Sequence, residues 1–133
     1  MTAKLHQHIT WREIHAQPAI WRSWAERLDV AALRAWIDAQ DAAEIWFCGA
    51  GSSAYIGDIV VSALEGSASR RLRAVPTTDL VSRPAAFLKD RNPLVVSIGR
   101  SGNSTETIGT LDALDVLAPR APRINITCNS KSA

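Results

Sequence analysis

The sequence lacks several features that would assign it to a broad class at once. It has no apolar run near the roughly 20 residues of a membrane-spanning helix. Its first residues contain no apolar signal-peptide core. The net charge of +2 in 133 residues is too small to indicate nucleic-acid binding. We therefore expect neither a membrane nor a nucleic acid as a partner.

Cysteine is scarce as well. Cys48 and Cys128 each stand at the end of an apolar run. Two isolated cysteines in a chain without an export signal are expected to stay reduced rather than form a disulfide. This cysteine usage indicates a cytoplasmic protein.

The motifs of several enzyme classes are also missing. No Gly-Lys-Ser/Thr sequence completes a P-loop, and residues 99–103 lack the final glycine of the nucleophile elbow of serine hydrolases. The histidines His6, His8 and His15 all precede the first predicted strand. No cluster of histidine, cysteine and aspartate has the spacing of metal ligands. We therefore predict no metal, and no cofactor outside the one alternative considered below.

The chain does contain a regular alternation of strands and helices. The apolar runs that predict strands, and the helical spacings that predict helices, are as follows: strands at 44–48, 71–76, 94–98 and 123–128, and helices at 54–64, around 84–88 and at 104–117. Such alternation is typical of an α/β fold with an open parallel sheet and helices on both faces. We expect the flavodoxin-like strand order 2-1-3-4-5.

Residues 1–41 precede the first strand and predict a separate helical segment. Thr10 and Glu13 are spaced as a capping box, and Pro18 suits the first turn of another helix. Asp29 is a candidate cap for a further short helix, so the region after Pro18 forms either one helix or two. The tryptophans here recur at helical spacing, which predicts a stripe that packs on another domain or subunit.

Two stretches rich in glycine and hydroxyl side chains follow the first and third predicted strands, at 49–53 and 99–107. At each, a strand gives way to a helix, so backbone N–H groups and the positive end of a helix dipole face outward. In an open α/β sheet, ligands bind where the strand order reverses, which here lies between strands 1 and 3. The two stretches therefore predict one anion-binding crevice, most simply for a phosphate.

A plainer interpretation is that these residues only form turns and helix caps. Ser52 is a good N-cap, and Asn103 and Glu106 are spaced as a capping pair. Either stretch alone fits this interpretation, whereas the two together favour the crevice. Arg100 suits two roles equally well, a contact to a phosphate or an ion pair with Glu106.

Residues 49–54 also match the dinucleotide-binding pattern G-x-G-x-x-A. That pattern calls for an acidic residue about twenty positions further on. The chain has Arg70, Arg71 and Arg73 there instead, and Asp79 lies too far along. Because an arginine can hold the 2′-phosphate of NADP, an NADP-binding domain remains an alternative.

Both stretches resemble the SIS (sugar isomerase) domain family, whose members bind phosphosugars. Residues 51–53 resemble its Gly-Thr-Ser loop, and residues 99–107 resemble its Ser-x-Ser-Gly-x-Thr/Ser-x-Asp/Glu-Thr loop, with Gly99 where many members have serine. Further segments are similar to the AgaS-like group, called tagatose-6-phosphate ketose/aldose isomerases or galactosamine-6-phosphate deaminase/isomerases. These segments are 10–14, 17–18, 51–58, 76–82, 99–104 and 125–129.

The resemblance implies a SIS fold, with 1–41 as an N-terminal helical segment and 42–133 as part of the first of two tandem SIS domains. The last strand and helices of that domain would be missing. The family implies a homo-oligomer assembled through SIS domains. Because no helix follows the fourth predicted strand to cover the sheet, we also expect the N-terminal part of a longer polypeptide.

The resemblance further implies a phosphosugar-binding site and a reaction. The implied binding residues are Gly51, Ser52, Ser53, Arg100, Ser101, Gly102, Ser104 and Thr107. The implied reaction opens the sugar ring, moves a proton between C1 and C2 and releases ammonia, converting galactosamine 6-phosphate to tagatose 6-phosphate. Isomerase, deaminase and hydrolase activities all fall within that expectation.

In related hexosamine-phosphate isomerases the general base comes from later in the chain. We therefore name no catalytic residue and expect this chain alone to be inactive. A phosphosugar-sensing regulatory SIS module is the non-enzymatic alternative.

Overall fold

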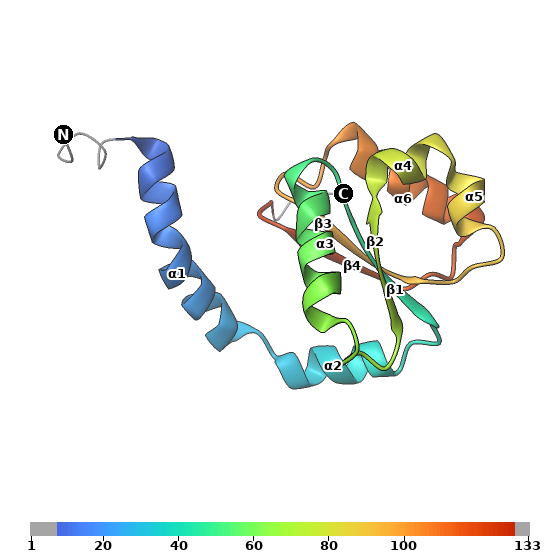
Figure 1. Cartoon of the computed structure of the whole chain (residues 1–133), viewed down its shortest axis with the longest axis horizontal. Coiled ribbons are helices and arrows are strands. Elements are labelled where there is room, and N and C mark those ends of the chain that lie inside the picture. The colour runs from blue at the N-terminus through green and yellow to red at the C-terminus, as the bar shows by residue number, and fades with distance from the viewer. Residues whose placement is uncertain (1–7, 130–133) are drawn as a thin grey trace. The chain divides into compact units, whose positions relative to one another are not determined.

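The computed structural model describes residues 8–129, and the chain divides into two compact units, Met1–Ala39 and Gln40–Ala133. Within the described residues, the first unit contains α1 (Ile9–Arg27) and α2 (Val30–Asp38). The second contains β1 (Glu44–Gly49), α3 (Ser52–Leu64), β2 (Arg71–Pro76), α4 (Thr77–Ser82), α5 (Pro84–Leu88), β3 (Leu94–Gly99), α6 (Thr105–Leu117) and β4 (Arg123–Thr127) (Figure 1). Each predicted strand is present, with its bounds shifted by at most one residue.

The first unit has two helices, which answers the question that the sequence left open. Asp29 caps α2 as predicted, because its side chain accepts a hydrogen bond of 2.9 Å from the N–H of Ala32. The capping box predicted at Thr10 is wrong, since α1 begins at Ile9 with His8 as its N-cap and no side-chain cap bond.

The prediction that Pro18 begins a new helix is also wrong, because Pro18 lies inside α1. Proline has no N–H, so α1 lacks one backbone hydrogen bond at this point. No residue of α1 is buried, and Trp21 and Trp24 are 64% and 52% exposed. Both rings are thus largely open, and the surface that they pack on stays a prediction.

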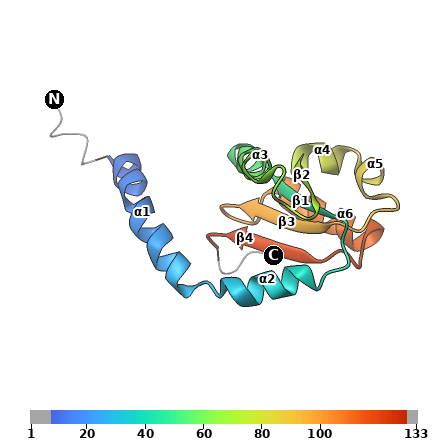
Figure 2. The ribbon, with the colours of Figure 1, turned by 60° about the horizontal axis from the view of Figure 1, so that its bottom comes forward.

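The second unit is built on a parallel sheet with the strand order β2-β1-β3-β4, as the sequence predicted. β1 pairs with β2 on one side and with β3 on the other, and β4 pairs with β3. Figure 2 shows the sheet running from β2 at one edge to β4 at the other. The order of the strands therefore reverses at β1 and β3, where the sequence placed the crevice.

The two faces of the sheet carry different helices. Successive side chains of a strand point to opposite faces. Trp46 packs in a buried cluster with residues of α4, α5 and α6, and its ring meets Phe87 of α5 edge to face, with the ring centroids 6.4 Å apart. The next residue, Phe47, faces α3, where a Cβ at Gly57 would lie 3.1 Å from the Phe47 carbonyl oxygen. A glycine at position 57 thus allows α3 to lie close on the opposite face.

The helix α4 has no counterpart among the predicted elements. It follows β2 directly after Pro76, and Leu80 from its middle is buried in the core. Its six residues complete fewer than two turns, which is too short for helical periodicity to be recognised in the sequence. The predicted strand order does not depend on this helix.

Glu44 at the start of β1 forms ion pairs with arginines of β2 and of the segment that precedes β3. Its carboxylate accepts a hydrogen bond of 2.7 Å from Trp46 Nε1 and lies 3.5–3.6 Å from the guanidinium nitrogens of Arg71, Arg73 and Arg91. Burial raises the pKa of Glu44, but the Trp46 hydrogen bond and the charges of the three arginines outweigh it, so its pKa lies below the ordinary value. The ionised carboxylate therefore stabilises the fold.

We predict that Glu44→Gln lowers the free energy of unfolding by about 1 kcal/mol at pH 7. Because the pKa of Glu44 is lowered in the folded state, its contribution is complete above the unfolded pKa and disappears as the pH falls through the folded value. Urea unfolding at several pH values should show the two proteins converging as the pH falls below the ordinary range of a glutamate pKa. The exposed Asp112→Asn is the control, and a difference that stays constant with pH would contradict the prediction.

Candidate active site

The first loop, residues 50–51, joins β1 to α3. Gly51 has a φ of +55°, which favours glycine, and it stands as the N-cap of α3 without a side-chain cap bond. The N–H groups of Ser53 and Ala54 donate to the carbonyls of Ala50 and Gly51 at 3.1 and 3.0 Å. Ser52 is the first residue of the helix, so the prediction that it caps α3 is wrong.

The second loop, residues 100–104, joins β3 to α6. Gly102 has a φ of +70°, and the hydroxyl of Ser101 accepts a hydrogen bond of 3.3 Å from the N–H of Asn103. The N-cap of α6 is Ser104, whose Oγ accepts a hydrogen bond of 3.2 Å from the N–H of Thr107. The capping pair predicted at Asn103 and Glu106 is therefore wrong by one position. The cap is a hydroxyl of the proposed phosphate loop itself.

Ser104 and Thr107 also bond to each other, with 2.9 Å between their hydroxyl oxygens. A hydroxyl has one proton and can accept two further bonds. Each of these side chains therefore keeps some capacity for a ligand, although it already has a protein partner.

The two loops lie side by side at the carboxyl edge of the sheet. β1 and β3 are paired up to Cys48 and Ser97, and the loops begin two and three residues further on. Among residues 8–129, the backbone N–H groups of Gly51, Ser52, Ser101 and Gly102 have no protein acceptor. Two helix N-termini and these N–H donors thus converge on one region, which favours an anion there.

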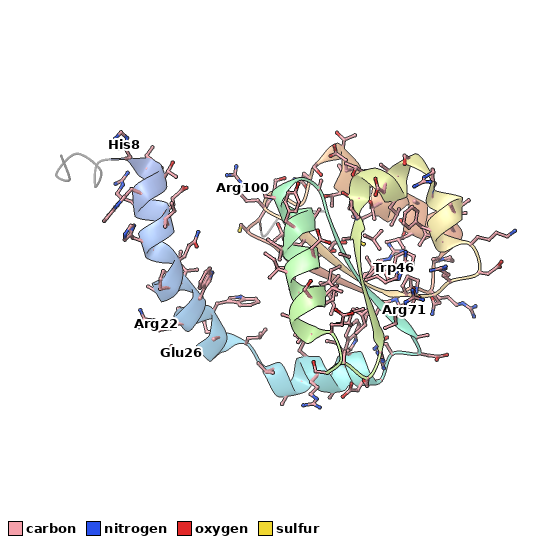
Figure 3. The ribbon with its side chains drawn as sticks, in the orientation of Figure 1. His8, Arg22, Glu26, Trp46, Arg71 and Arg100 are labelled. Atoms are coloured by element: carbon pink, nitrogen blue, oxygen red, sulfur yellow. The ribbon has the colours of Figure 1, made fainter. Side chains whose placement is uncertain are left out.

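Arg100 extends this edge with a positive charge. Figure 3 shows its side chain at the same edge, with the guanidinium turned away from the sheet. Across the described part of the chain, no ion pair joins Arg100 to Glu106. A contact between Arg100 and a phosphate remains a prediction.

The residues that follow β4 contact the second loop, a connection that the sequence analysis missed. The Thr127 hydroxyl and the Cys128 N–H donate to the Arg100 carbonyl at 3.2 and 3.1 Å. The Asn129 side chain donates to the Ser101 carbonyl at 3.1 Å. The sequence did contain a signal for this contact, since Thr127 and Asn129 stand at the carboxyl end of the fourth strand. The carboxyl ends of parallel strands lie on the same side of a sheet.

The two cysteines, and any side chains within residues 8–129 that could hold a metal, bear on whether a reactive group accompanies the loops. Burial raises the pKa of the Cys48 thiol to about 12, against the opposing charge of Arg73, so the thiol stays neutral. Cys48 and Cys128 are both free, as predicted. In residues 8–129 no group of three His, Cys, Asp or Glu side chains is arranged to hold a metal. His8 is exposed, and His6 lies outside the described residues.

The arginines that supported NADP as a possible ligand lie toward the amino ends of the strands, away from the two loops. Arg71 lies at the start of β2 (Figure 3). Arg71 and Arg73 both form ion pairs with Glu44, at the start of β1. Arg70 donates to the Gln40 carbonyl, just before β1. A 2′-phosphate site would lie at the carboxyl end of β2. The NADP interpretation therefore loses the residues on which it depended.

Comparison with known proteins bears on this geometry. No protein-family model matches the chain. The D-galactosamine-6-phosphate deaminase AgaS of Escherichia coli O157:H7 is 36% identical over 132 residues, covering 93% of this chain and 34% of that protein. The protein of the same name from Shewanella sp. (strain ANA-3) is 35% identical over 130 residues, covering 92% and 34%. The crystal structure of tagatose-6-phosphate ketose/aldose isomerase from Escherichia coli superimposes with a TM-score of 0.82 and 34% identity, over 99% of this chain and 37% of that one.

The chain belongs to the AgaS-like group of the SIS family. Its parallel sheet with the order β2-β1-β3-β4 is that of the SIS fold. The AgaS-like chain spans about a third of the curated relatives that it matches, 34% of each of the two described above. Their names include deaminase and isomerase, and none of these names includes hydrolase. No helix within residues 8–129 is long and apolar enough to cross a membrane.

Two glycines of the AgaS-like chain end neighbouring strands under different constraints. A Cβ at Gly49 would lie 2.7 Å from the backbone carbon and oxygen of Ser53, whereas a Cβ at Gly99 would lie no closer than 3.6 Å to the N of Gly102. We predict that Gly49→Ala lowers the free energy of unfolding by about 1–3 kcal/mol through overpacking. The matched Gly99→Ala should leave it unchanged or raise it by about 0.5 kcal/mol.

Chemical denaturation of the two variants measures this difference. Equal destabilisation would contradict the close approach of the first loop to the end of β1. Such a result would mean that the room for a Cβ is the same at Gly49 and at Gly99.

Proposed function

We propose that this chain supplies the phosphate-binding part of a sugar-phosphate isomerase/deaminase, which converts galactosamine 6-phosphate to tagatose 6-phosphate and ammonia. The observation that carries the proposal is the meeting of two glycine-containing loops, with serines in or directly after them, at the adjacent ends of β1 and β3. The names of the relatives support the class of substrate.

Each group at this edge has a role in the proposal. The N–H groups of the two loops and the starts of α3 and α6 surround the phosphate oxygens, as at other helix N-termini that bind phosphate. Ser53 and Ser101 add hydroxyl donors from the two sides. Arg100 adds a positive charge that matches the phosphate dianion.

Ser104 and Thr107 have a second role besides binding. Their hydroxyls bond to each other, and the Ser104 hydroxyl also accepts the N–H of Thr107, so the start of α6 is ordered before a ligand arrives. The proposed substrate would form hydrogen bonds with hydroxyls that the protein already holds in place. Groups that are held in place in advance bind at a lower entropic cost.

Holding the phosphate fixes one end of an open-chain sugar. The bonds that react lie at C1 and C2, at the far end of the six-carbon chain from a 6-phosphate. Binding energy from this non-reacting end can position the reacting carbons next to an acid or base. We name no base in this chain, and we propose that the isolated chain binds the substrate weakly without converting it.

Two further properties form part of the proposal. A cytoplasmic location fits the two free cysteines. Assembly into a homo-oligomer through SIS domains would bring copies of this sheet together, and it rests on the family resemblance. The division into an N-terminal helical segment, 1–41, and a SIS part, 42–133, likewise rests on that resemblance.

We predict that galactosamine 6-phosphate and tagatose 6-phosphate shift the amide resonances of residues 51–53 and 100–107 in an NMR titration of the chain. Ser101→Ala should weaken binding roughly tenfold or more, because a hydrogen bond to a charged ligand is lost. Ser67→Ala is the matched control, since the Ser67 hydroxyl donates to the Leu64 carbonyl in the connection that leads to the amino end of β2, away from the two loops.

Three results would contradict the proposal. The first is the absence of shifts with either sugar phosphate in the 10 mM range, which corresponds to about 3 kcal/mol of binding. The second is a response to NADP that exceeds the response to both sugars. The third is equal weakening by Ser67→Ala and Ser101→Ala.

A further inference from the structure

We propose that Thr127 and Asn129 are positioning residues of the phosphate site. They hold two carbonyl groups of the second loop, and this turns the neighbouring N–H groups toward the ligand. The inference rests on the proposed function, because it assigns the phosphate as that ligand. It adds the end of β4 to a site that otherwise consists of the ends of β1 and β3.

The contacts form a connected set. The Thr127 hydroxyl donates its single proton to the Arg100 carbonyl at 3.2 Å and accepts the N–H of Asn129 at 3.1 Å. The Asn129 side-chain amide then donates to the Ser101 carbonyl at 3.1 Å. Each group acts in a role that its chemistry allows. The Thr127 hydroxyl therefore orders both Arg100 and the residue that holds Ser101.

Because of the geometry of the peptide bond, these contacts also set the directions of the next two N–H groups. In a trans peptide the carbonyl of one residue and the N–H of the next lie in one plane and point in opposite directions. Holding the Arg100 carbonyl toward β4 turns the Ser101 N–H away from β4. Holding the Ser101 carbonyl toward Asn129 turns the Gly102 N–H away in the same manner. These are two of the N–H groups without a protein acceptor among residues 8–129.

The second loop needs such support because its own backbone does little to fix it. Arg100 and Ser101 are exposed, and Gly102 adopts a φ of +70°, a region that glycine enters without strain. Pairing of β3 with β4 ends at Gly99 and Thr127. The Cys128 N–H continues the strand pairing to Arg100, and one residue further on the Asn129 side chain donates to the Ser101 carbonyl.

The first test compares variants of Thr127. Thr127→Val removes the hydroxyl and keeps the shape, whereas Thr127→Ser keeps the hydroxyl. We expect Thr127→Val to weaken binding of inorganic phosphate and of tagatose 6-phosphate roughly 3- to 10-fold, as expected for one hydrogen bond. Thr127→Ser should restore the affinity of the unaltered chain. Thermal unfolding of each variant accompanies the titration.

Asn129→Ala provides the second variant, with the same expected loss of affinity. Asn92→Ala is its matched control, because the Asn92 side chain donates to the Asp41 carbonyl at the other edge of the sheet. Without ligand, ¹⁵N relaxation of Ser101 and Gly102 measures how well the loop is held. We expect increased motion of these two amides in Thr127→Val and Asn129→Ala, and none in Asn92→Ala.

The two measurements separate this inference from the proposed function. Unaltered affinity in both Thr127→Val and Asn129→Ala would overturn the positioning role. A fall in melting temperature without any increase in loop motion, or a failure of Thr127→Ser to restore binding, would do the same. If the unaltered chain binds no phosphate although its loop amides are rigid and become mobile in the variants, the phosphate proposal fails while the support of the loop by Thr127 and Asn129 stands.

Discussion

The whole site depends on one feature of the sheet, the pairing of β1 with β2 on one side and with β3 on the other. Right-handed crossovers that leave β1 and β2 in opposite directions place α3 on one face and α4 to α6 on the other. The two loops then emerge next to each other with no helix between them. A crevice at this point follows from the strand order and needs no special side chain.

Glycine has different roles at the two strand ends. At Gly49 the start of α3 returns so close that any Cβ would meet the Ser53 backbone at 2.7 Å. At Gly99 there is room for a side chain, since a Cβ would lie no closer than 3.6 Å to the N of Gly102. The first loop is therefore limited by packing, whereas the second tolerates variation and relies on hydrogen bonds to Thr127 and Asn129 for its shape.

The sequence predicted the features that depend on local patterns. The strand 94–98 is an apolar run that lies largely buried in the structure, and the parallel sheet followed from the alternation of strands with helices. The caps were predicted less well, since Ser104 and Asn103 are neighbours with equal cap propensity and only the fold selects one. The support from Asn129 joins residues 28 positions apart, which no local pattern reports.

The hydrogen bonds at the start of α6 also decide which groups a phosphate would gain most from. Ser104 and Thr107 already bond to each other and to the backbone, so a ligand that bonds to them partly replaces existing contacts. Within residues 8–129 the N–H groups of Ser101 and Gly102 have no such protein contact to lose, and with a phosphate they would exchange only water for a charged oxygen. A hydrogen bond to a charged group contributes more than a neutral one, by a factor of about two. In the proposed site the net gain in binding would therefore come mainly from the backbone of the second loop, and the orientation of that backbone would matter more to binding than the number of hydroxyls around it.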